Sequence, residues 1–134
     1  MYFLEIPLRN YLLHESSVSE VFCEQSKIWF IFDCGFWNNN HEKLEECKIM
    51  INILHLDINN TDRFFNVQKH GKHGIINKKI SFSAFLKKLK KEHFVIDVDY
   101  YSEFERSLLL IGRISNREFE IKITDIDNIS FLHS

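Results

Sequence analysis

The chain has 134 residues, of which 45% are hydrophobic and 27% charged, a composition typical of a folded domain and not of a disordered segment. This length predicts one domain that spans residues 1–134 and buries about two-thirds of its unfolded surface. No stretch approaches the roughly 18 consecutive apolar residues of a membrane helix, and the first residues lack the pattern of a secretory signal. Three cysteines cannot all pair within one chain, which favours reduced thiols and a cytoplasmic location.

The formal net charge of −2 hides an uneven distribution along the chain. Residues 1–62 carry 4 Lys and Arg against 10 Asp and Glu, and residues 94–134 carry 4 against 8. Residues 63–93 between them carry 9 basic side chains and 1 acidic one. Such asymmetry can steer a charged partner, but it also arises when one fold neutralises itself across adjacent elements.

The first third of the chain predicts strands. Residues 2–8 alternate like an edge strand, with a short helix at 10–14 as the alternative. Residues 18–24 predict a strand that turns through Gln25 and Ser26. The next run, Lys27 to Asp33, is the densest apolar stretch, and we expect a central strand buried on both faces.

The middle of the chain contains one ambiguous segment. Residues 44–56 fit a helical face, yet the β-branched residues from about Lys48 alternate like a strand, which we favour. A turn at 57–62 and a strand at 63–68 follow, and residues 69–79 form a basic loop with two of the four glycines.

One amphipathic helix is predicted at about residues 82–92. Its apolar side chains recur at helical spacing, and Ser81 or Ser83 can cap its N-terminus. The lysines of its last turns suit the negative end of the helix dipole. The apolar positions are Phe82, Phe85, Leu86 and Leu89, and the opposite, basic face carries Lys87, Lys88, Lys90 and Lys91.

The last third reads as an antiparallel meander. Residues 94–101 alternate, residues 108–114 form another apolar run, and residues 118–123 alternate cleanly, with a short strand at 126–131 as an addition. The predicted fold is therefore α+β: a mainly antiparallel β-sheet, which could be strongly curved, with one helix packed on it.

No catalytic constellation emerges. His70 and His73 lie in a glycine-containing loop without nearby carboxylates or cysteines to complete a metal site. Asp97 and Asp99 would share one face of a strand, as any solvent-facing pair would. We expect no catalytic residue, metal or cofactor, and no enzymatic activity; a site assembled from residues remote in sequence is the alternative.

Aromatic residues beside carboxylates are typical of protein–protein interfaces. Two clusters fit this description, one after the central apolar run and one in the meander. The alternative for the first cluster is that its rings pack into one end of the core. The candidate partner-binding residues are Phe36, Trp37, Asp97, Asp99, Tyr100, Tyr101 and Glu103.

The basic segment 69–91 offers a second hypothesis, a nucleic-acid-associated regulatory protein. Against this, Phe82 and Phe85 lie on the helix face opposite the lysines, so they would pack into the core and not stack on bases. The acidic thirds of the chain would also repel nucleic acid, so we favour a protein partner.

Three sequence features carry a resemblance to a known family. His14-Glu15-Ser16 precedes a strand, a turn and the run Lys27–Asp33, which closes on Gly35-Phe36-Trp37, and a lysine-rich helix and a three-strand meander follow. This arrangement resembles small β-rich immunity proteins of bacterial polymorphic and contact-dependent toxin systems. The resemblance implies a non-catalytic protein that binds a cognate protein toxin and blocks its active site or an essential surface. It does not imply which face binds.

Overall fold

The computed structural model describes residues 11–13, 15–33, 36–38, 43–44, 47–55, 58–71 and 77–132. The strands in these ranges are β1 (Tyr11–Leu12), β2 (Ser17–Glu24), β3 (Lys27–Phe32), β4 (Phe36–Asn38), β5 (Lys43–Leu44), β6 (Lys48–Ile53), β7 (Phe65–Lys69), β8 (Lys78–Ile80), β9 (Phe94–Ser102), β10 (Ser107–Ile114), β11 (Arg117–Ile123) and β12 (Ile126–Leu132). A 3₁₀ segment covers Ile58–Arg63, and the α-helix α1 covers Phe82–Lys91.

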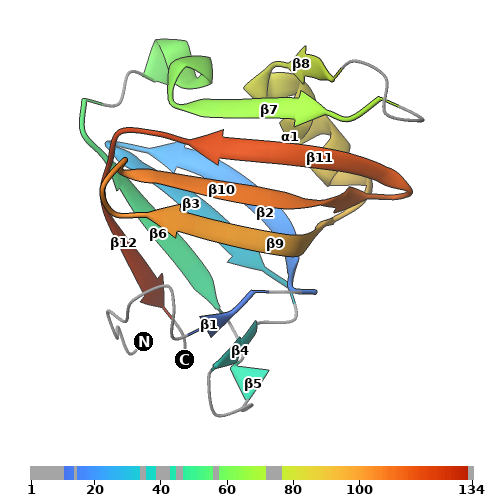
Figure 1. Cartoon of the computed structure of the whole chain (residues 1–134), viewed down its shortest axis with the longest axis horizontal. Helices are drawn as coiled ribbons and strands as arrows, with labels where there is room; N and C mark the ends of the chain where they lie inside the picture. Colours follow the sequence, from blue (N-terminus) through green and yellow to red (C-terminus); the bar gives the residue numbers. More distant parts are fainter. Residues whose placement is uncertain are drawn as a thin grey trace.

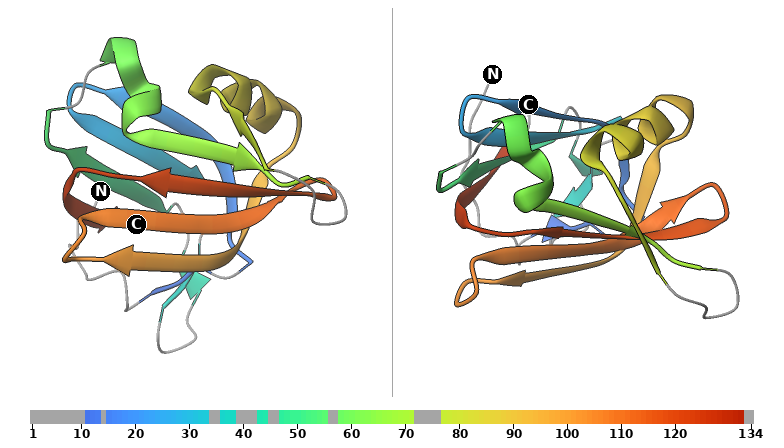
Figure 2. Two further views of the ribbon diagram at one scale, coloured as in Figure 1. Left: turned by 45° about the horizontal axis from the view of Figure 1, so that its top comes forward. Right: turned by 90° about the horizontal axis from the view of Figure 1, so that it is seen from above.

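The main sheet has nine strands in the order β12-β6-β3-β2-β9-β10-β11-β7-β8, all paired antiparallel. It folds into two layers, with β7, β9, β10 and β11 in front of β2, β3, β6 and β12, which cross behind them at an angle (Figure 1). The layers join where β2 pairs with β9 over only two positions, Ser17 with Val95 and Val18 with Phe94. Figure 2 shows the same fold from two further directions.

Three register shifts help the sheet to bend. They lie in β2 between Val18 and Glu20, in β9 opposite Ile111 and Gly112, and in β12 between Ile126 and Asn128. A β-bulge bends its strand and increases the local twist, which lets one sheet wrap around a single core. The prediction of a mainly antiparallel sheet is confirmed.

The helix α1 closes one side of the core with aromatic side chains. The Phe85 ring centroid lies 5.9 Å from that of Phe65, 6.0 Å from that of Phe94 and 6.5 Å from that of Phe119. Phe82 meets Phe65 edge-on at 4.8 Å. These contacts join the helix to strands β7, β9 and β11, because each ring buries a large apolar area in a favourable edge-to-face arrangement.

The predicted helix and its cap are confirmed, since the Ala84 amide donates to Ser81 Oγ at 3.1 Å and α1 ends at Lys91.

In the part of the chain that the structure describes, no helix has both the length and the apolar character needed to cross a membrane.

Strand β3 differs from its prediction. Ile28, Phe30 and Phe32 are buried, whereas Lys27, Trp29 and Ile31 on the other face are only half-buried. The expectation of burial on both faces is therefore wrong, because this antiparallel sheet packs only one of its faces against the core. The short strand β8 was not expected, and the predicted strand at 2–8 lies outside the described residues.

Candidate functional site

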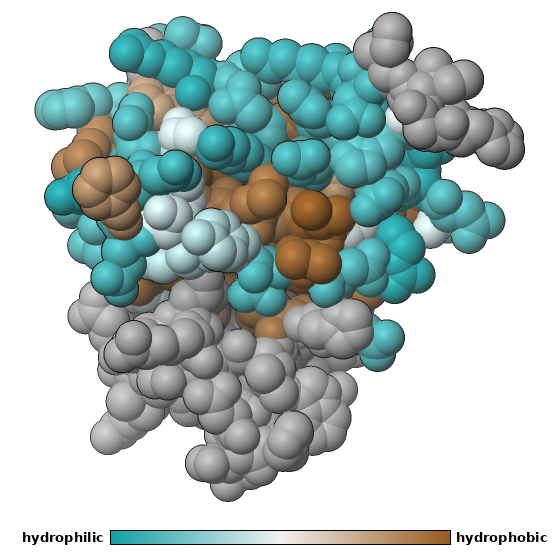
Figure 3. Space-filling model, viewed as in Figure 1, coloured by the Kyte–Doolittle hydropathy of each residue, from teal (hydrophilic) through white to brown (hydrophobic). Residues whose placement is uncertain are grey.

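The outward face of β9 and β10 carries apolar side chains where solvent-facing strands usually carry polar ones. Tyr100 pairs with Leu109, and Val98 pairs with Ile111. Val98 is 50% exposed and Tyr100 63% exposed, while Leu109 and Ile111 are half-buried. Figure 3 shows this hydrophobic area over the middle of β9 and β10, with hydrophilic side chains along β11 and β7. We call these four residues the outer apolar face.

The outer apolar face exists because of the bulge in β9. Phe94 and Ile96 point into the core, so simple alternation would bring Val98 and Tyr100 inward as well. The register instead passes from Ile96 opposite Gly112 to Val98 opposite Ile111, with Asp97 as the extra residue. One inserted residue reverses the facing of every later side chain in the strand.

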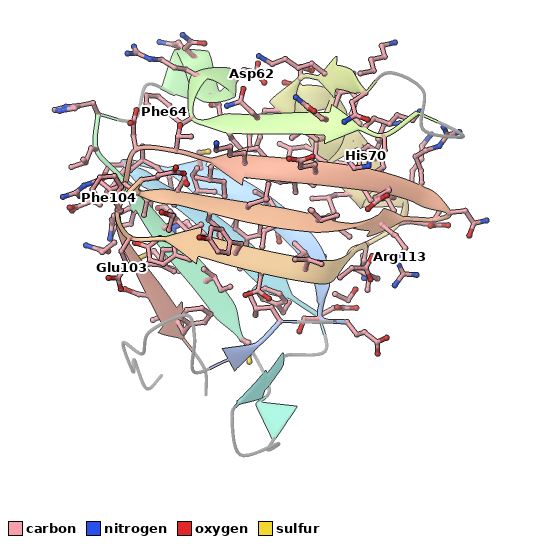
Figure 4. The ribbon with its side chains drawn as sticks, in the orientation of Figure 1. Asp62, Phe64, His70, Glu103, Phe104 and Arg113 are labelled. Carbon is pink, nitrogen blue, oxygen red and sulfur yellow. The ribbon has the colours of Figure 1, made fainter. Side chains whose placement is uncertain are left out.

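Phe104 is the most exposed large hydrophobic residue of the described chain, at 98%. It lies in the turn of residues 103–106 that joins β9 to β10, at the left end of the molecule in Figure 4. The turn is held in place: the Glu105 amide donates to Ser102 Oγ at 3.1 Å, and the Ile126 amide donates to the Arg106 carbonyl at 3.0 Å. Hydrogen bonds thus hold the backbone of this turn, and the Phe104 side chain projects from it into solvent.

Neighbouring turns meet the turn of residues 103–106 through backbone hydrogen bonds. The Leu54 amide donates to the Asp125 carbonyl at 2.9 Å, one residue before Ile126. Leu54 is itself 37% exposed, so a second apolar side chain lies near this end of the sheet. We call residues 54, 103–106 and 125–127 the turn end.

The turn end is acidic. Glu103, Glu105, Asp125 and Asp127 are exposed, against a single basic residue, Arg106. The Arg106 Nη1 atom lies 3.9 Å from Asp127 Oδ1 and donates to the Ile126 carbonyl at 3.4 Å, which fixes its position. An exposed aromatic ring surrounded by carboxylates suits a partner surface with an apolar recess and basic rim.

The structure separates the predicted partner-binding residues of the meander. Asp97 points outward and binds Arg113 through Nε at 2.9 Å and Nη2 at 3.0 Å, toward the opposite end of the face from Phe104 (Figure 4). Asp99 lies opposite Leu110, a buried residue, so its side chain is on the inward face of the strand. The expectation that Asp97 and Asp99 share one face is wrong, because the bulge lies between them.

Tyr100 and Tyr101 also face opposite ways. Tyr100 belongs to the outer apolar face, whereas Tyr101 lies opposite the buried Leu108 and packs against the core. Burial, with a smaller contribution from the Glu103 carboxylate, raises the pKa of Tyr101, and Arg106 partly opposes this. Tyr101 is therefore a neutral, structural phenol, and Tyr100 and Glu103 are the predicted meander residues that the structure leaves exposed.

The other predicted cluster is only partly described. Phe36 and Trp37 belong to β4, where Phe36 pairs with Leu44 and Trp37 pairs with Lys43 and Leu12. Their backbones thus form the centre of the small sheet β1-β4-β5. The directions of their side chains lie outside the described residues, so their role in binding stays a prediction.

The sequence interpretation missed Val98, Phe104, Leu109 and Ile111. Two signals were available: an aromatic residue between two glutamates in a turn, and an isolated glycine, Gly112, inside an apolar strand. An isolated glycine in a strand indicates a bulge or a close backbone approach, and both occur here.

The predicted basic face of α1 divides in two. Lys88 and Lys91 line a surface hollow of about 320 Å³ with Lys69 and Arg117, and Lys87 and Lys90 are exposed outside it. A neighbouring hollow of about 460 Å³ is lined by residues that include His70 and Arg117.

His70 lies at the end of β7, where two carboxylates contact its ring (Figure 4). The Glu118 carboxylate is 3.2 Å from Nδ1 and the Glu120 carboxylate 3.3 Å from Nε2. Within the described ranges, no group of three or more His, Cys, Asp or Glu side chains is placed to hold a metal ion. His73, the second histidine that the sequence analysis considered as a metal ligand, lies outside these ranges.

Cys23 is a packed thiol and not an activated one. It faces the core on β2, and burial raises its pKa, although a hydrogen bond with Thr61 acts in the opposite direction. A raised pKa keeps the thiol protonated near neutral pH and therefore weakly nucleophilic. Cys34 lies outside the described residues.

The raised thiol pKa predicts a loss of stability in alkali. As the pH rises above about 9, the ordinary value for this group, the unfolded chain loses its Cys23 proton before the folded chain does. Stability is thus complete below that pH and falls as the pH rises toward the folded-state value. Urea unfolding at pH 8, 9 and 10 should show this decline, and Cys23→Ala should flatten it. An unchanged slope in Cys23→Ala would exclude this assignment.

No family model, curated protein or solved structure matches the chain.

Proposed function

We propose that the protein is a non-catalytic binding protein of the immunity type, which binds a cognate protein toxin in the cytoplasm and occludes its active site or an essential surface. The contact surface is the outer apolar face together with the turn end. The observation that carries this proposal is Phe104, whose ring is 98% exposed on a turn held by hydrogen bonds to Ser102 and Ile126.

The exposed Phe104 side chain costs the monomer little and can stabilise a complex. An isolated Phe104 ring contributes no packing to the fold, whereas its full burial in a partner would contribute about 1.5–3 kcal/mol. Because the turn is already fixed, little backbone entropy is lost on binding. Val98 and Tyr100 on the adjoining strand extend the apolar contact. They pair with the half-buried Ile111 and Leu109, beyond which Glu120 and Lys122 of β11 form a charged border.

The charges of the turn end select the kind of toxin. Four carboxylates around Phe104 and Leu54 repel an acidic surface and attract a basic one, which speeds association and supports specificity. A toxin domain with a basic substrate-binding surface, as a nuclease has, fits this charge. Occlusion of such a surface by the turn end would inhibit the toxin without any chemistry by this chain.

Affinity capture from the native host tests the proposal. We expect tagged protein at moderate salt to recover one dominant protein, and co-expression of this chain to suppress the toxicity of that protein. The matched variants are Phe104→Ser, which should recover much less of that protein, and Lys90→Ser on the exposed side of α1, which should recover as much as the wild type. Recovery of no specific protein, or equal recovery by both variants, would contradict the proposal.

A second candidate is a nucleic-acid-associated regulatory protein that uses residues 69–91. The observation in its favour is the convergence of Lys69, Lys88, Lys91 and Arg117 on one hollow. Titration of the hollow with a single-stranded oligonucleotide, in the wild type and in Lys88→Gln/Lys91→Gln, tests this candidate.

A further inference from the structure

The hollow beside α1 collects cations from three separate elements. Lys69 comes from β7, Arg117 from β11, and Lys88 and Lys91 from the last turns of the helix. Its floor includes Phe119 and Ile114, which are 1% and 7% exposed. We call this hollow, with its four basic residues, the basic hollow.

Two of these cations occupy positions that the core would normally fill with apolar side chains. Lys69 lies directly opposite Phe119, and Arg117 directly opposite Ile114. Opposite residues of an antiparallel pair point to the same side of the sheet. Lys69 and Arg117 therefore lie on the core side of the sheet, where its end meets the helix. Lys88 and Lys91 are three residues apart on α1 and so share one side of the helix.

The lining of the basic hollow holds more basic than acidic side chains. Glu92 is the single carboxylate among the described residues that line it, and its side chain accepts a hydrogen bond from Ser115 Oγ. Lys88, Lys91 and Arg117 thus bring three formal positive charges to this one carboxylate, and Lys69 lies beside them. The Lys88 ammonium lies over the Phe119 ring, 6.0 Å from its centroid, a cation–π contact that favours this position.

We propose that the basic hollow is a binding site for a phosphate-bearing anion of the di- or triphosphate class. Its volume of about 320 Å³ lies at the lower end of the range for small-ligand sites. The planar guanidinium of Arg117 can bind two phosphate oxygens at once, while lysine ammonium groups act as mobile point charges around them. Binding would relieve the mutual repulsion of Lys88, Lys91 and Arg117. This site is independent of the proposed toxin-binding surface.

Calorimetric titration with inorganic triphosphate at about 150 mM salt tests the site, since diffuse surface attraction is largely screened there. We expect saturable binding by the wild type and at least a tenfold loss in Lys88→Gln/Lys91→Gln. The matched control is Lys87→Gln/Lys90→Gln, which removes the same charge from the same helix turns outside the hollow and should bind like the wild type. Both pairs should unfold at the wild-type urea concentration.

Absence of saturable binding, or equal weakening in the two double variants, would overturn the proposal. A second titration with a short single-stranded thymidine oligonucleotide distinguishes the source of the phosphate. Oligonucleotide binding that triphosphate competes away, and that Lys88→Gln/Lys91→Gln abolishes, would assign the site to a nucleic-acid backbone. Triphosphate binding without oligonucleotide binding would assign it to a free small anion.

Discussion

Gly112→Ala is expected to destabilise the fold by about 3 kcal/mol or more, because no space exists for the added methyl group. A Cβ atom at this position would lie 2.2 Å from the Val95 carbonyl oxygen and 2.6 Å from Cζ of Phe94. Neither atom can yield easily, since Val95 belongs to the neighbouring strand and Phe94 is completely buried against Phe85. Strand β10 would have to move away from β9, which disrupts both the sheet and the aromatic core.

Thermal unfolding followed by circular dichroism measures this effect. For a chain of this length, the loss corresponds to a fall in Tm of roughly 10 °C. Arg113→Ala, on the next residue, is the control: its exposed ion pair with Asp97 should be worth less than about 1 kcal/mol. If Gly112→Ala has the same Tm as Arg113→Ala and the wild type, then β9 and β10 do not approach each other as closely as described.

Local signals in the sequence predicted the helix and much of the sheet. Phe82, Phe85 and Leu89 recur at helical spacing and do pack inward, and Ser81 does cap the helix. The hairpin of β2 and β3 followed from two apolar runs separated by two polar residues. Such elements are predictable because their periodicity and their turn residues agree.

The facing of β9 was not predictable from alternation alone. The row Phe94, Ile96, Val98 and Tyr100 looks continuous in the sequence, but the bulge at Asp97 sends its two halves to opposite faces. A bulge depends on contacts with the partner strand, here with Gly112, which follows Asp97 on the next strand of the hairpin and not within the row itself. The basic hollow escaped prediction for the same reason, since strand register brings Lys69 and Arg117 to the helix.

Phe104→Ser is expected to weaken binding of the captured toxin at least about 30-fold, which corresponds to about 2 kcal/mol. The physical reason is the loss of the one large apolar side chain that projects fully from the turn end. The fold itself should keep its stability within about 0.5 kcal/mol, because the exposed ring makes little contact with the rest of the chain. A variant that loses affinity but keeps its stability has lost a residue that contacts the partner.

The turn end also predicts how the affinity responds to charge. Glu103→Gln/Glu105→Gln removes two carboxylates beside Phe104 and should slow association with a basic toxin, most visibly at low salt. The aromatic contact should instead govern dissociation, so Phe104→Ser should mainly raise the dissociation rate.

The most direct measurement is the Kd of the purified toxin for three versions of this chain, determined by titration calorimetry under one set of conditions: wild type, Phe104→Ser and Lys90→Ser. We expect Lys90→Ser to bind like the wild type and Phe104→Ser to bind at least about 30-fold more weakly. Wild-type affinity in Phe104→Ser, or a loss confined to Lys90→Ser, would contradict the claim that this protein binds its partner through the turn end.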